Sequence, residues 1–198
     1  MKKHRTIHRF ITQKGLAVRV YRLRSDDAEW LIDLFDHLSA TSRYLRFNEY
    51  LDHPDAEVVR REAQVLADVD AKRGGAWIAV ADLPGEPNAP IAGARYVRTP
   101  VPGVAEASVA VRDDLHGQGI GSELLVFIAR RAKADGIHKL AASFHTSNRA
   151  IWALLASAPF QVATEVHGPQ TDVLVDLDGI VVDETREPVL AQPSMRIT

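Results

Sequence analysis

The residue types and spacing that most clearly suggest a chemical role in this sequence lie in a glycine-rich segment. The segment HGQGIGS, residues 116–122, places three glycines at alternate positions between an apolar run and an apparent helix. Glycine allows positive φ angles and lets an oxyanion approach the backbone without meeting a Cβ. The start of a helix adds unpaired N–H groups and a partial positive charge. We therefore predict an anion-binding loop that uses the backbone amides of Gly117, Gln118, Gly119, Ile120, Gly121 and Ser122.

Two known phosphate-binding motifs do not fit this segment. A P-loop requires GxxxxGK[ST], and no lysine stands at the matching position. A dinucleotide fingerprint requires GxGxxG at the opening of a βαβ unit, whereas the spacing here is GxGxG after three antiparallel-looking strands. A glycine-rich turn that binds no ligand also fits the spacing, and the residues alone do not separate it from an anion site.

Glu106 is the candidate general base. It lies in the strand-like run VAEASVAVR, residues 104–112, just before the glycine segment. Alternation along a strand puts Glu106 on one face with Ser108 and Ala110, and puts the valines on the other face. A partly desolvated carboxylate on such a small, polar face is suited to removing a proton. A solvated strand glutamate is the alternative that the residues leave open.

The helices that must position these residues follow from apolar spacing. Helices are predicted over 25–40, 53–72, the stretch after the glycine segment as far as Asp135, and 147–157. We expect Ser25 to cap the first helix and Pro54 to lie in the first turn of the second. Gly74-Gly75 and Gly136 are the expected stops of the second and third helices.

The strands are shorter and are separated by turn residues. They are predicted at 16–23, 76–83, 90–98, 104–112, 137–144, 160–166 and 171–177. Proline- and glycine-rich turns join the second, third and fourth strands, which favours an antiparallel meander. The element order βααβββαβαββ predicts an α+β fold with a mixed sheet and helices on its faces.

Composition narrows the class of protein. The chain has 198 residues, a formal net charge of −2 and a pI of about 6.4, which suits one domain without a general affinity for nucleic acid or anionic lipid. We expect the domain to span 1–177 and a tail to span 178–198. Cysteine is absent and no HxxxH or HExxH spacing occurs, so neither a disulfide nor a metal site is predicted. The basic start lacks the apolar run of a signal peptide, so we predict a cytoplasmic protein that contacts no membrane.

The segment VAVRDDLHGQGIGSELL, residues 109–125, resembles the acyl-CoA signature of the GNAT superfamily of N-acyltransferases. In that pattern, [Q/R]-x-x-G-x-[G/A], Gly119 and Gly121 match the small positions and His116 stands where the family has Gln or Arg. The resemblance covers nearly the whole chain, from Leu16 to Leu177. It implies a three-layer αβα fold with a splayed central strand pair, and acetyl-CoA as the co-substrate with no metal.

The resemblance also assigns roles to further residues. The strand before the glycines would offer Val109, Ala110 and Val111 to the pantetheine arm, and His116 would lie beside the diphosphate. The run SNRAIWALLASAPF is similar to a family helix in which Asn148 contacts the coenzyme. The tyrosine that often serves as general acid in that helix is replaced by Leu155.

The acceptor side is suggested by a narrower resemblance. SRYLRF, AGARYV and AEASVAVRDDLHGQGIG together look like the acetyltransferase domain of bacterial Pat-type protein-lysine acetyltransferases. In those proteins the acid at the position of Glu106 is the general base. The predicted connector 41–51 follows the first helix where the family lines its acceptor pocket, so Tyr44 and Arg46 are expected to bind the substrate.

These residues favour an acetyl-CoA-dependent N-acetyltransferase that acts on a primary amine, either a protein lysine or a small molecule. A non-catalytic acyl-CoA sensor and a plain nucleotide-binding domain are the alternatives. The sequence leaves the amine acceptor, the general acid and the oligomeric state open, a homodimer included.

Overall fold

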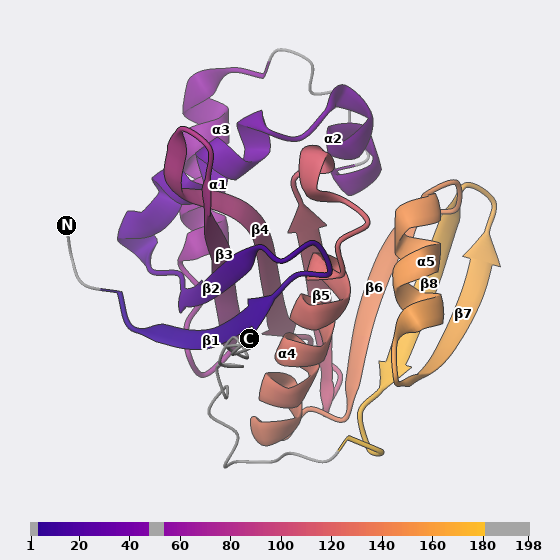
Figure 1. Ribbon diagram of the computed structural model, residues 1–198. Coiled ribbons are helices and arrows are strands. Elements are labelled where there is room, and N and C mark those ends of the chain that lie inside the picture. Colours follow the sequence, from indigo (N-terminus) through magenta and orange to yellow (C-terminus); the bar gives the residue numbers. More distant parts are fainter. Residues whose placement is uncertain (1–3, 48–53, 181–198) are drawn as a thin grey trace, which may run out of the picture.

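The computed structural model of the protein describes residues 4–47 and 54–180. Within these ranges one sheet of eight strands carries five α-helices and two short 3-10 helices (Figure 1). The strands are β1 (Thr6–Ile11), β2 (Ala17–Arg22), β3 (Gly74–Leu83), β4 (Glu86–Arg98), β5 (Val104–Val111), β6 (Lys139–His145), β7 (Gln161–His167) and β8 (Gln170–Asp176). The helices are η1 (Ser25–Asp27), α1 (Ala28–Asp36), α2 (Ala40–Phe47), α3 (Ala56–Ala67), η2 (Asp113–Leu115), α4 (Ile120–Ala134) and α5 (Arg149–Ser157).

The sheet opens into a fork at its centre. Its order is β1-β2-β3-β4-β5-β6-β8-β7, and every neighbouring pair is antiparallel except β5 and β6. This parallel pair needs a crossover, and α4 supplies it. Only Val104–Glu106 pair with Lys139–Ala141, and beyond Glu106 the two strands share no register. The predicted mixed, mostly antiparallel sheet with a splayed central pair is confirmed.

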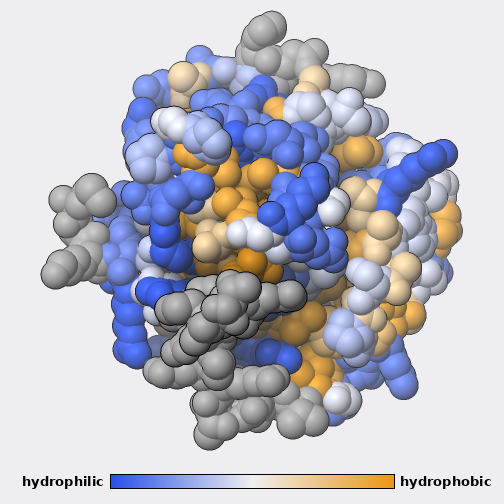
Figure 2. Space-filling model, in the orientation of Figure 1, coloured by the Kyte–Doolittle hydropathy of each residue, from blue (hydrophilic) through white to orange (hydrophobic). Residues whose placement is uncertain are grey.

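Helices cover both faces of the sheet and complete three layers. Alternation along β3 divides the core, because Trp77 and Ala79 join the cluster of α4 whereas Ile78 and Val80 join that of α1. All four are at most 3% exposed, so this strand is buried on both faces. On the face seen in Figure 2 most residues are hydrophilic, and the apolar ones gather mainly towards the middle. The predicted αβα arrangement is thus confirmed.

Two elements differ from the sequence expectation. The strand β1 was not predicted, since its residues TIHRFI do not alternate cleanly and its register with β2 shifts between Thr6 and His8. Residues 41–51 were expected to form a connector, but α2 occupies Ala40–Phe47 as a short helix. A helix of eight residues is marginal by itself. Its formation here depends on contacts with residues far away in the chain.

The helix caps also need correction. Ser25 does not cap α1: it lies in η1, where the Asp27 carboxylate accepts from the Arg24 N–H at 2.9 Å. Pro54 precedes α3 instead of lying in its first turn, because Asp55 is the cap and accepts from the amides of residues 57 and 58.

Of the two predicted glycine stops, one is wrong and one is confirmed. α3 ends at Ala67, well before Gly74, which with its neighbour begins β3. Gly136 does follow the end of α4, with φ +76° and its N–H donated to the Lys133 carbonyl at 3.0 Å.

The described residues end at 180, four residues after the end of β8. Leu177 is fully buried, and its N–H donates to the His138 carbonyl. The tail predicted from 178 lies mostly outside the described residues, so the boundary stays a prediction.

None of the helices within 4–47 and 54–180 has the length and apolar character that spanning a bilayer requires. Over the same residues no three histidine or acidic side chains lie together as metal ligands would.

Candidate active site

The glycine loop forms the start of α4. Gly117 has φ +70° and Gly119 has φ +83°, a left-handed region that side chains with a Cβ rarely adopt. Gly119 is the N-cap of α4, a helix of 15 residues. Among the described residues, no acceptor is bonded to the N–H groups of 117–119, and the first turn of any helix leaves its own amides unpaired. The loop therefore presents consecutive N–H donors at the positive end of a helix dipole.

The turn between β1 and β2 supports this loop from the side. The Gln118 carbonyl accepts from the Gln13 N–H at 3.1 Å, and the Gln118 side-chain oxygen accepts from the Thr12 hydroxyl at 3.3 Å. Gln118 is only 6% exposed. Its side chain thus faces the protein, and its backbone N–H is what it can offer a ligand. Sequence reasoning missed Thr12 and Gln13 because only the unpredicted strand β1 brings them here.

His116 turns back towards the preceding strand. Its Nε2 lies 2.9 Å from the Val111 carbonyl oxygen. A carbonyl only accepts, so Nε2 must carry the proton and donate. This contact ties the first residue of the glycine segment to the end of β5.

The backbone of β5 points into the fork at alternate residues. The Arg112 N–H donates to the Ile91 carbonyl of β4, and the β4–β5 register has no shift. Strand alternation therefore directs the backbone N–H and C=O of Ala110 towards β4. It directs the backbone N–H and C=O of Val109 and Val111 into the fork. Of the three residues predicted to meet the pantetheine arm, Val109 and Val111 have backbone groups free of a neighbouring strand on that side.

Glu106 stands at the point where the fork opens. It is the last residue of β5 that pairs with β6, opposite Ala141, and its side chain is exposed to solvent. Two guanidinium groups lie within electrostatic reach, Arg46 of α2 and Arg95 of β4. Burial lowers the pKa of both, and the negative charge of Glu106 opposes that effect. The predicted base is thus exposed to solvent and not partly desolvated as expected, because the neighbouring strand β6 diverges from β5 beyond this residue.

The helix α2 brings the predicted substrate residues to the fork. Arg46 Nη2 donates to Ser108 Oγ of β5 at 3.0 Å. The Tyr44 ring lies 5.9 Å from the His145 ring of β6, centroid to centroid. α2 therefore contacts both arms of the fork. Burial is the largest influence on Arg46 and lowers its pKa, and the nearby charge of Arg95 lowers it further.

A cavity of about 460 Å³ opens beside α2, between the sheet and the helices α1 and α3. Its walls are mainly apolar, and its polar lining includes Arg46, Arg95 and Ser108. A second hollow of about 430 Å³ lies on the other side of Arg46, against β6 and β8, and includes His145 and Asp172. Sequence reasoning missed Arg95, although its parity on β4 was a usable signal, since in the antiparallel meander it stands opposite Ser108.

The remaining predicted coenzyme residues lie along α4 and α5. Ile120 is buried in the core, and a Cβ at Gly121 would touch the side chains of Leu154 and Val111 at 3.7 Å. The Ser122 hydroxyl is 3.2 Å from that of Ser157, which links the two helices. Asn148 caps α5, and its side-chain oxygen accepts from the Ile151 N–H at 3.2 Å. Its contact with coenzyme stays a prediction.

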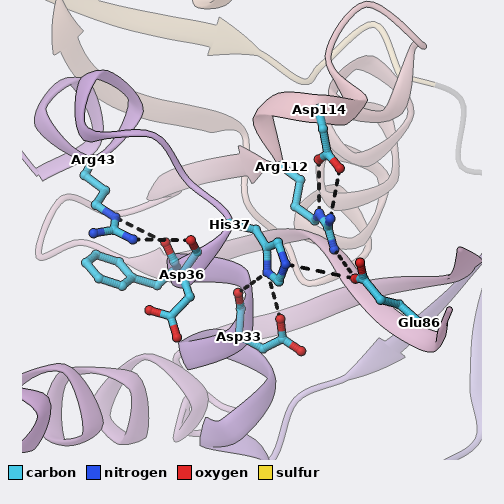
Figure 3. A network of polar contacts seen from close by, with 8 residues as sticks. Asp33, Asp36, His37, Arg43, Glu86, Arg112 and Asp114 are labelled. Atoms are coloured by element: carbon cyan, nitrogen blue, oxygen red, sulfur yellow. Dashed lines mark hydrogen bonds and ion pairs between the residues drawn. The ribbon is translucent and has the colours of Figure 1, made fainter. Parts of the chain in front are cut away.

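A charged network fixes the segment between β5 and the glycine loop (Figure 3). Arg112 binds the Asp114 carboxylate with Nε and Nη2 at 3.0 and 2.9 Å, and donates from Nη1 to Glu86 at 2.8 Å. His37 Nε2 lies 4.0 Å from the same Glu86 oxygen. The network thus joins the end of α1, the β3–β4 hairpin and η2.

Next to this network, Asp113 connects η2 with α2. Its carboxylate accepts from the Ser39 N–H at 2.8 Å and from the Ser42 hydroxyl at 2.5 Å. The helix that carries Arg46 and the loop that carries the glycines are therefore joined through one side chain.

Comparison with known proteins identifies a family for this chain. Residues 31–158 match the model of the acetyltransferase (GNAT) family. The L-methionine sulfoximine/L-methionine sulfone acetyltransferases of Pseudomonas aeruginosa and Pseudomonas paraeruginosa are 36% identical over 64 residues, which is 32% of this chain. The match spans 37% of the length of these curated relatives.

Solved structures share the fold. The GNAT domain of S. lividans PAT has a TM-score of 0.71 at 24% identity, over 85% of this chain and 96% of that one. A cAMP-binding acyltransferase from Mycobacterium smegmatis has a TM-score of 0.58 at 21% identity, over 91% of this chain and 50% of that one. The family match covers well over half of the sequence, and the chain belongs to the GNAT acetyltransferase family.

Proposed function

We propose that this protein is an acetyl-CoA-dependent N-acetyltransferase that acts on a primary amine. The observation that carries the proposal is the run of backbone donors at residues 117–122, which begins α4 next to the fork of the sheet. Membership of the GNAT family supports acyl transfer to an amine. The named relatives that match part of the chain are also acetyltransferases.

The glycine loop fits the diphosphate of coenzyme A. A Cβ at Gly117 would meet nothing within 4 Å, so space is open where an anion would approach. Helix N-termini with free amides bind phosphate groups without the help of cationic side chains. Residues 117–122 would hold the diphosphate. Val109 would pair with the pantetheine arm inside the fork, as would the N–H of Val111, whose carbonyl already accepts from His116. Bound there, the coenzyme supplies a thioester as the acyl donor.

Glu106 would activate the acceptor. An alkylamine is almost wholly protonated at neutral pH and must lose a proton before it can attack. The exposed carboxylate at the opening of the fork would take that proton, directly or through water. The amine lone pair then forms the C–N bond, and the C–S bond breaks with its electrons on sulfur. The second amine proton is lost to solvent, and the thiolate takes up a proton to leave as coenzyme A.

No side chain is assigned as the acid for the thiolate. Leu155 stands where the family resemblance would put a tyrosine, and it packs against the core. The thiolate would therefore leave unassisted or receive its proton from water. Positioning of the two reactants would supply the larger part of the rate enhancement.

The acceptor is either a protein lysine or a small amine. A solved structure of similar fold is the GNAT domain of S. lividans PAT, whereas the curated relatives are named for acetylation of L-methionine sulfoximine and L-methionine sulfone. The apolar cavity of about 460 Å³ beside Arg46 has the size of a small-molecule site and favours the second class.

The first test is calorimetry with acetyl-CoA, followed by assays of thiol release with a panel of amines. We expect Glu106→Gln to lower kcat by about 100-fold or more, as loss of a general base does, and to leave acetyl-CoA binding nearly unchanged. Glu165→Gln is the matched control, because it makes the same change at an exposed position of β7. An unchanged kcat in Glu106→Gln would remove this residue from the mechanism, and absence of acetyl-CoA binding would refute the function itself.

A non-catalytic acyl-CoA sensor is the second candidate. The leucine at 155 favours it, since this side chain cannot donate a proton to a thiolate. The sensor hypothesis predicts tight binding of acetyl-CoA together with no transfer to any amine in the panel. Transfer to one of them would exclude it.

A further inference from the structure

The apolar cavity between the sheet and the helices α1 and α3 has a cationic end. Leu31, Leu34 and Phe35 of α1 form part of its apolar wall, and Arg95 and Arg46 stand where it meets the strands β4 and β5. Arg95 lies opposite Ser108 in the register, and Ser108 is the residue whose hydroxyl accepts from Arg46. The two guanidinium groups are thus gathered around one serine.

Arg95 lacks a direct counterion. Among the described residues its side chain forms no hydrogen bond and no ion pair, although it is only partly exposed. Burial lowers the pKa of Arg95, and Glu106 opposes that effect from a distance. Since a guanidinium withdrawn from water is stabilised by an anion, this cavity end favours a negatively charged group. A carboxylate suits it best, because guanidinium and carboxylate form two parallel hydrogen bonds.

The spacing on the sheet relates this cationic end to the proposed base. Glu106 pairs with Val97 and Ser108 pairs with Arg95, so Arg95 and Glu106 are diagonal neighbours on one face. Diagonal positions in an antiparallel pair lie roughly 7–8 Å apart. A compact molecule can therefore place an amine at Glu106 and a carboxylate at Arg95 together.

We infer that the acceptor is an amino acid with an apolar side chain, whose carboxylate binds Arg95 with Arg46 and Ser108 beside it, and whose side chain enters the cavity. This inference rests on the proposed acetyltransferase function and narrows its substrate class. Arg95 is then a specificity-determining residue. It binds the group that distinguishes a free amino acid from the side-chain amine of a protein lysine.

The test compares L-leucine with L-leucinamide, in which an uncharged amide replaces the carboxylate. We expect L-leucine to bind at least about tenfold more tightly by ligand-observed NMR without coenzyme, and to have the higher kcat/KM in the thiol-release assay. Arg95→Gln should abolish this preference and leave acetyl-CoA affinity unchanged. Arg9→Gln on β1 is the control, because it removes an exposed strand arginine that also has no ion pair among the described residues.

The outcomes separate the inference from the function on which it rests. Equal binding of the two ligands to the unmodified protein, or a preference that survives in Arg95→Gln, overturns the inference. The ligand comparison on the unmodified protein needs no variant, so it decides the matter even if Arg95→Gln fails to fold. Equal transfer to amines with and without a carboxylate would refute the inference alone. Absence of transfer to every amine would refute the proposed function.

Discussion

At the scale of single residues, Arg112 shows how charge holds the glycine loop in place. It is the least exposed charged residue among those the structure describes, at 4%. A buried guanidinium loses its hydration, and only well-aligned acceptors offset that cost. Asp114 and Glu86 provide three hydrogen bonds between them. The side chain thereby fixes the turn that leads from β5 into the glycine segment.

The ion pair between Arg112 and Asp114 predicts that the free energy of unfolding depends on pH. Hydrogen bonds from Arg112 lower the pKa of Asp114 below its ordinary value. A depressed carboxyl pKa contributes stability above the unfolded value of about 3.9, and that contribution disappears as the pH falls through the folded value. Asp114→Asn should therefore melt a few degrees lower than the unmodified protein at pH 7. The difference should shrink progressively as the pH falls below the unfolded value of about 3.9, measured by thermal denaturation from neutral to acidic pH. A difference that stays constant with pH would rule out the ion pair as its source.

Residue types predicted part of the site and missed another part. The glycines and Glu106 stand out locally, since a positive φ and a strand carboxylate leave a signal within a few residues. Arg95 and Thr12 leave no such local signal, because their roles come from strand register and from a hairpin about 100 residues away from the loop it supports. The sequence likewise does not show that the side chain of Gln118 faces Thr12.

At the scale of elements, the strands of the meander and the helices α4 and α5 were predictable because their apolar periods are strong. The helix α2 was not, because its stability depends on Asp113 holding Ser42 and on Ser108 holding Arg46. The edge strand β1 was missed for a similar reason. It has a single neighbour and an irregular register, so its formation depends on pairing with β2 and on packing of His8 against Phe127 of α4.

The start of α4 gives a prediction at this scale. Gly117→Ala and Gly168→Ala both place a Cβ at a positive φ, +70° and +60°, in open space. The backbone strain is thus similar in the two variants, about 1–2 kcal/mol. We expect both to lower the melting temperature alike, and only Gly117→Ala to weaken acetyl-CoA binding, by about tenfold in calorimetry. Equal affinities in the two variants would show that the amides of this loop do not bind the coenzyme.

At the scale of the whole molecule, the fork connects two faces of one sheet. Val109 and Val111 pack with the cluster of α4, whereas Ser108 and Ala110 line the cavity beneath α1 and α3. Coenzyme and acceptor are therefore expected to approach from opposite faces and to meet beside Glu106, where the parallel pairing ends. Element order predicted this architecture. The cavity beneath α1 and α3 could not be predicted, because three separate segments enclose it.

The central claim is that the backbone amides of residues 117–122 bind the diphosphate of coenzyme A. Its most direct test is to follow the amide resonances of ¹⁵N-labelled protein during titration with coenzyme A and, separately, with pantetheine, which lacks the diphosphate. We predict that the resonances of 117–122 shift strongly with coenzyme A and hardly at all with pantetheine. Resonances that stay unmoved by coenzyme A, or that move equally with pantetheine, would contradict the claim.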